Sequence, residues 1–73
     1  MSPEKMIRMA NQIATFFHSK PHDQGVTGVA NHISDFWDPR MRNQLFAHID
    51  AGGAELDALV LEAAPTIRRP KAA

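Results

Sequence analysis

Short runs of apolar residues at helical spacing, separated by proline or glycine breaks, constrain this chain more than any other feature. No segment shows the alternation of apolar and polar residues that is typical of a half-buried strand. The sequence therefore predicts an all-α fold, a small bundle of three to four short helices with short connections. The breaks lie at Pro21, Asp38-Pro39, Gly52-Gly53 and Pro65.

The first predicted helix begins at Ser2-Pro3-Glu4 and runs to about Ser19. Serine caps a helix, proline suits its first position, and an acidic residue in the first turn complements the helix dipole. The apolar surface of this helix is wider than one short neighbouring helix needs to cover. It comprises Met6, Ile7, Met9, Ala10, Ile13, Ala14, Phe16 and Phe17.

Two further helices are predicted on either side of an Asp-Pro corner. The first spans about Gln24 to Trp37, and the second runs from Pro39 to about Asp50, with Asp38 as its cap. The inward residues of the first are predicted to be Val26, Val29, Ala30, Ile33, Phe36 and Trp37. Those of the second are predicted to be Met41, Leu45, Phe46 and Ile49.

The last predicted helix covers about Glu55 to Ala64 and follows a left-handed stop at Gly52-Gly53. Pro65 is expected to end it. The helical domain is therefore predicted to cover residues 1–64, and residues 65–73 are predicted to form a basic, flexible tail.

Length, cysteine content and charge narrow the class of protein. The chain has 73 residues and no cysteine, which excludes disulfides, thiolate metal sites and cysteine nucleophiles. A core of this size gives little stability by itself. The chain therefore either folds as a minimal self-contained bundle or is completed by a partner protein. Eight basic and eight acidic residues count against nucleic-acid binding, which depends on phosphate neutralisation. Without a bilayer-spanning apolar run or a signal-peptide core, we expect a soluble cytoplasmic protein.

The histidines, serines and glycines, residue types that form metal, catalytic or phosphate-binding sites in other proteins, have structural interpretations in this sequence. The four histidines, at positions 18, 22, 32 and 48, lack the converging geometry of a zinc site and are expected at the surface. No serine lies at the strained strand-to-helix turn that carries the nucleophile of α/β-hydrolases. No strand precedes the glycines of GVTGV, so they are expected to permit close helix packing or to loosen a helix start.

The corner between the second and third predicted helices has two compatible interpretations. In the first, Trp37 only fills the corner between the helices. In the second, it also anchors a partner protein together with Arg40 or Arg42, because tryptophan and arginine are enriched at interfaces. The pair Arg68-Arg69 is either solvated or an electrostatic strap to an acidic partner surface. The candidate partner-binding residues are Phe17, Trp37, Arg40, Arg42, Arg68 and Arg69.

A small helix-turn-helix DNA-binding protein is the alternative interpretation. Residues 21–49 contain two helices joined by a tight connection, and Arg40 and Arg42 lie early in the second, where recognition residues would be. The balanced charge and the nearby Asp35 and Asp38 argue against it.

Three stretches together resemble a known family: MIRMANQIATFF, HISDFWDPRMRNQL and LVLEAAP. Their order and spacing are similar to the delta subunit of cytoplasmic NAD-dependent, molybdenum-containing formate dehydrogenases. The resemblance extends from about Pro3 to Pro70. Its most specific parts are the run from Met9 to Ile13 with Phe16-Phe17, and Phe36-Trp37 with the run from Pro39 to Arg42.

The resemblance implies a noncatalytic accessory subunit that stabilises the complex or helps it to mature. It implies that a large partner subunit holds the molybdenum cofactor and oxidises formate. Iron-sulfur clusters and a flavin in other subunits would pass the electrons to NAD. No cofactor and no active-site residue is implied for this chain. A maturation chaperone that leaves the finished enzyme is the third hypothesis, and self-association of the isolated chain is expected from its apolar surface.

Overall fold

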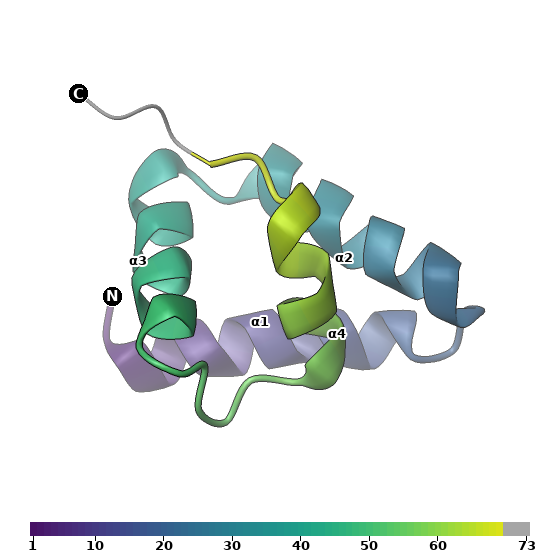
Figure 1. Ribbon diagram of the computed structural model, residues 1–73, viewed down its shortest axis with the longest axis horizontal. Coiled ribbons are helices and arrows are strands. Elements are labelled where there is room, and N and C mark those ends of the chain that lie inside the picture. Colours follow the sequence, from purple (N-terminus) through teal and green to yellow (C-terminus); the bar gives the residue numbers. More distant parts are fainter. Residues whose placement is uncertain (70–73) are drawn as a thin grey trace.

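The computed structural model describes residues 1–69, and within that range it contains helices and no strand. Figure 1 shows α3 and α4 standing across α1, with α2 rising behind α4. The predicted all-α fold is therefore confirmed. The elements are α1 (Pro3–Phe17), α2 (His22–Phe36), α3 (Pro39–Asp50), α4 (Ala58–Ala63) and the 3-10 helix η1 (Ala64–Thr66).

The predicted caps of α1 and α3 are present. The Ser2 hydroxyl accepts a hydrogen bond from the backbone N–H of Lys5 at 3.2 Å. The Asp38 carboxylate accepts one from the N–H of Met41 at 2.9 Å. A proline follows each cap at the first helical position, where its missing N–H costs no hydrogen bond.

The left-handed stop after α3 is also confirmed. Gly52 and Gly53 have φ angles of +120° and +66°, values that residues with a side chain rarely adopt. The N–H of Gly53 donates to the carbonyl of His48 at 2.9 Å, and that of Gly52 donates to Ile49 at 3.0 Å. This is the Schellman pairing, which satisfies the last carbonyls of the helix.

The predicted start of α4 was wrong by one turn. Glu55 has a φ of +66°, which no α-helix accommodates. Asp57 is the true cap, since its carboxylate accepts the N–H of Leu59 at 2.9 Å. The α-helix ends at Ala63, before Pro65 as predicted, but the chain continues through Pro65 as the 3-10 helix η1.

The boundaries and inward faces of α2 also differ from the prediction. The helix begins at His22 and ends at Phe36, and Trp37 adopts extended angles, φ −86° and ψ 133°. Phe36 was predicted inward, but its side chain is 75% exposed. The change of backbone direction at Trp37 turns the indole into the core and leaves Phe36, on the last helical turn, facing solvent.

Glycines allow α1 and α2 to approach closely, as one of the two interpretations of GVTGV predicted. A Cβ built on Gly25 would lie 3.0 Å from the carbonyl oxygen of Phe17. One built on Gly28 would lie 2.3 Å from the Phe17 ring. The glycines therefore make room for the end of α1. The α4 helix packs against both α1 and α2 and closes the core.

Part of the predicted tail packs on the bundle. Ile67 is 3% exposed and belongs to the core, and the Arg68 N–H donates to the Ser34 hydroxyl at 3.0 Å. Residues 70–73 lie outside the described residues, and the predicted domain boundary at residue 64 stays a prediction.

Candidate partner-docking surface

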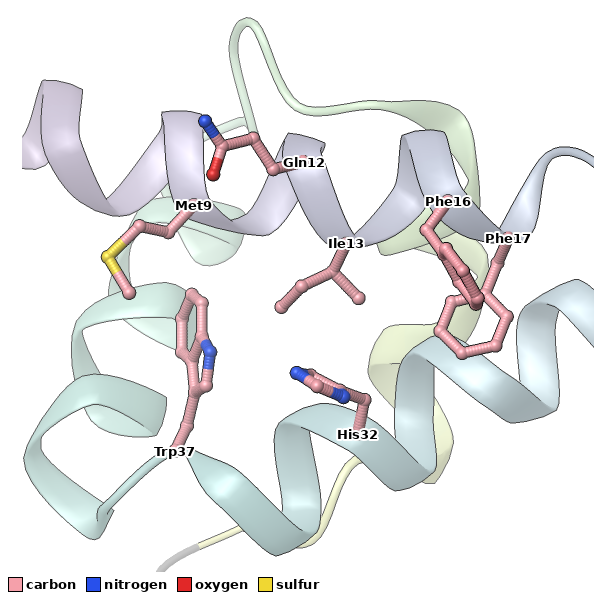
Figure 2. Close-up of a pocket in the computed structure, with 7 residues that line it drawn as sticks. All are labelled: Met9, Gln12, Ile13, Phe16, Phe17, His32 and Trp37. Atoms are coloured by element: carbon pink, nitrogen blue, oxygen red, sulfur yellow. The ribbon is translucent and has the colours of Figure 1, made fainter.

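An open apolar groove of about 540 Å³ lies between α1 and the C-terminal half of α2, and we call it the α1–α2 groove. Figure 2 shows the α1 side chains along one wall, with His32 and Trp37 rising from the opposite side. Three polar groups, the Gln12 amide, the His32 ring and the indole N–H of Trp37, interrupt an otherwise apolar lining. The lining residues are Met9, Gln12, Ile13, Phe16, Phe17, His32 and Trp37.

Two exposed phenylalanines extend this apolar surface. Phe16 is 65% exposed and packs edge-on against Phe17, with ring centroids 5.0 Å apart. Phe36 is even more exposed than Phe16, and the centroids of the Phe36 and His32 rings are 4.8 Å apart. We call the groove together with Phe36 the docking face. Contiguous apolar surface of this kind on a soluble domain usually marks a binding site.

The aromatic candidates from the sequence meet at this groove. Phe17 is half-buried, lines the groove and rests against Gly28. Trp37 is only 5% exposed, so most of the indole fills the corner between α2 and α3. Figure 2 shows its ring directed from that corner toward Met9 on α1. The corner plug is therefore confirmed, whereas the anchoring of a partner by Trp37 stays a prediction.

Three of the four candidate arginines contact their own chain. Arg42 donates from Nε to the carbonyl of Trp37 at 3.2 Å and from Nη1 to the carbonyl of Arg68. Arg68 in turn donates to the Ser34 carbonyl at 3.0 Å and pairs with Asp35 at 3.2 Å.

Arg69 is the third arginine that contacts its own chain, and Arg40 is the exception. The Arg69 guanidinium lies 4.0 Å above the centre of the Phe46 ring, a cation–π contact. Arg40 is exposed and forms no hydrogen bond or ion pair among residues 1–69. The arginines therefore fasten residues 67–69 to the α2–α3 corner, and their predicted role toward a partner stays untested.

Sequence reasoning missed Phe16 and Phe36 as site residues, although the sequence holds a signal for them. Each belongs to an aromatic pair, Phe16-Phe17 and Phe36-Trp37. Adjacent residues of a helix point about 100° apart, so a small core can seldom bury both members of a pair. The member that is left outside is a candidate contact for a partner.

Histidines connect the helices to the segment that contains α4. His18 pairs with Asp57 at 2.7 Å, and His22 pairs with Glu62 at the same distance. His48 Nε2 lies 2.7 Å from the carbonyl oxygen of Ala54. The expected surface location of these histidines is confirmed, and their contacts are structural.

Asp57 is the best-connected carboxylate among these contacts. Partial burial raises its pKa, but the hydrogen bonds from His18 and from the N–H of Leu59, with the charge of His18, outweigh that effect. The pKa of Asp57 is therefore lowered below its ordinary value of 3.8. The charged form is the one that the fold stabilises.

Residues 1–69 contain neither a cluster of metal-binding side chains nor a membrane-spanning helix. No three histidine or acidic side chains there are grouped so that they could hold a metal ion. No helix in that range is long and apolar enough to span a bilayer.

Comparison with known families identifies the chain. The family model described as the NADH-dependent formate dehydrogenase delta subunit FdsD matches residues 5–64. The chain belongs to this family. The match extends from α1 through α4 and includes every residue of the docking face, so it confirms the resemblance seen in the sequence. No curated protein matches the chain.

The DNA-binding alternative gains no support from the described residues. Arg42, one of its two expected recognition residues, is held by the carbonyl groups of Trp37 and Arg68. The helix that would be inserted into DNA, α3, packs against α1.

Proposed function

We propose that this chain is a noncatalytic accessory subunit of a cytoplasmic NAD-dependent molybdenum formate dehydrogenase. It stabilises or matures the complex through protein–protein contact. Membership of the delta-subunit family supports this role, because a delta subunit is one of several chains of an enzyme. In this proposal the molybdenum cofactor, iron-sulfur clusters, flavin and NAD are held by the other subunits, and the large molybdenum subunit is the partner.

The docking face is the observation that carries the proposal. Phe16 and Phe36 expose most of their rings beside an open apolar groove. Moving one such ring from water to an interface contributes about 1.5–3 kcal/mol. A small bundle that leaves two phenylalanines outside its core is suited to binding a larger protein.

Co-expression of all subunits tests the proposal, with an affinity tag on the large molybdenum subunit. We expect this chain in the active enzyme at a fixed ratio to the large subunit. If it acts as a chaperone in maturation, it will be bound to the cofactor-free form and absent from the active enzyme. Deleting the chain should lower the yield of active complex, while formate oxidation per molybdenum in the remaining complex stays unchanged.

Two results would contradict the proposal. One is a chain that never purifies with any formate dehydrogenase subunit, in either cofactor state. The other is formate oxidation by the isolated chain, which would overturn its noncatalytic role.

A further inference from the structure

We propose that the α1–α2 groove receives one amphipathic helix of another subunit, with acidic side chains of that helix over Lys5 and Arg8. The inference rests on the proposed function and adds the secondary structure and the charge of the docking segment. Three properties of the groove support it: its length, its shortage of hydrogen-bonding groups, and the charge at one end.

The length of the groove fits two turns of a helix. Its α1 wall runs from Met9 to Phe16, seven residues apart, or about 10 Å at the rise of an α-helix. Apolar side chains at i, i+3 or i+4, and i+7 of a docked helix cover the same distance. Figure 2 shows space between Ile13 and His32 in the middle of the groove, where the central side chain would lie.

The lining favours a helix over an extended segment. A backbone buried in an apolar site needs partners for its N–H and C=O groups. The groove offers side-chain hydrogen bonds only from Gln12, His32 and the indole N–H of Trp37, and its walls are helices whose own backbone groups are paired. A helix pairs its backbone groups internally and presents only side chains, so it can fill the groove without unpaired polar groups.

Positive charge marks the Met9 end of the groove. Lys5 and Arg8 precede Met9 and Gln12 by four residues each on α1, so they continue the same face of the helix. Both are exposed, and their side chains form no ion pair among residues 1–69. Asp35, near the end of α2, is already paired with Arg68. An acidic partner would therefore gain both attraction and orientation.

A second copy of this chain fits the groove poorly. A symmetric contact would place two concave surfaces opposite each other, so neither groove would be filled. A helix from a different subunit does not have this disadvantage.

Cross-linking in the complete enzyme identifies the occupant. The photoreactive residue p-benzoylphenylalanine replaces Phe16, whose side chain is 65% exposed, so folding should be preserved. Illumination of the purified complex followed by peptide mapping should give one segment of another subunit. We expect apolar residues at helical spacing in that segment, with an acidic residue at the end nearest Lys5.

Charge exchange tests the orientation. The double variant K5E/R8E should be retained about tenfold less by the complex at low ionic strength, and the difference should shrink in high salt. Replacing the acidic residue of the cross-linked segment by lysine should restore retention of the double variant. The control is K20E, which reverses the charge of an exposed lysine beyond the Phe16 end of the groove and should be retained normally.

The outcomes separate this inference from the proposed function. If the wild-type chain purifies with the enzyme but Phe16 cross-links to a loop, to a second copy or to nothing, the helix is overturned and the accessory role stands. Normal retention of K5E/R8E overturns the claim that acidic side chains of the docked helix lie over Lys5 and Arg8. The accessory role stands in that case too. If the wild-type chain is absent from both the cofactor-free and the active complex, both ideas fail.

Discussion

Phe36 and Trp37 are adjacent aromatic residues with opposite surroundings. Phe36 ends α2 and faces solvent, whereas Trp37 leaves the helix and fills the corner before α3. Arg42 holds the backbone of this corner through the carbonyl of Trp37. A buried ring of the core and an exposed ring of the proposed docking face are therefore neighbours in the sequence.

Substitution of each residue should separate the two roles. Trp37→Ala empties the corner and should cost about 3–5 kcal/mol of unfolding free energy, enough to unfold a domain of this size. Phe36→Ala should change stability by no more than about 0.5 kcal/mol, because the ring is already exposed. Urea unfolding followed by circular dichroism measures both. Equal losses in the two variants would contradict this division.

At Gly28, the absence of a Cβ atom allows the Phe17 ring to pack closely against α2. Gly28→Ala gains about 1 kcal/mol in helix propensity, but its Cβ would meet the Phe17 ring at 2.3 Å. We expect overpacking to prevail, with a net loss of unfolding free energy, because such clashes cost about 1–3 kcal/mol. Adding Phe17→Leu should recover part of the loss. A rise in melting temperature for Gly28→Ala alone would show that Phe17 moves aside without penalty.

Among the elements, α4 depends most on contacts distant in sequence. The Asn11 side chain donates to the Glu55 carbonyl and accepts the N–H of Asp57, both at 2.8 Å. His18 and His22 add the pairs to Asp57 and Glu62. These contacts hold the loop in which Glu55 has its positive φ, and so place α4 over α1 and α2.

The lowered pKa of Asp57 predicts a pH dependence of stability. A carboxylate whose pKa is lower in the folded state stabilises the fold above its unfolded pKa, which is near 3.8. That contribution is lost as the pH falls from about this value through the lower folded pKa. Unfolding free energies of the wild type and Asp57→Asn, measured between about pH 2.5 and 6, should converge at the acidic end. A constant difference across this range would contradict the prediction.

On the scale of the whole molecule, one face of the α1–α2 pair is covered and the other is open. The α4 helix packs on both helices, and residues 67–69 close the α2–α3 corner. The α1–α2 groove has no such cover from residues 1–69. The chain therefore combines a closed core with an open apolar surface.

The open surface predicts weak self-association when the chain is isolated. We expect the apparent mass in sedimentation to rise with concentration, because exposed phenylalanines from different molecules will pack together. Phe16→Ser with Phe36→Ser should shift the chain toward a monomer and also reduce its incorporation into the enzyme. Thr27→Ser, at an exposed position on α2, is a control that should change neither. A wild-type chain that stays monomeric at every concentration would refute the self-association.

The sequence by itself determined the helices, the caps at Ser2 and Asp38, and the stop at Gly52-Gly53, because these depend on residues a few positions apart. It also identified the family. Only the tertiary structure decided where α4 begins, since Asn11 and Asp57 are 46 residues apart.

The tertiary structure also decided which aromatic ring of each pair is left outside and where the arginines bind. Arg42 reaches the Arg68 carbonyl across 26 residues of sequence. Helical periodicity shows that a side chain is apolar and on which stripe it lies. It does not show which neighbour covers that stripe, because that depends on how distant segments meet.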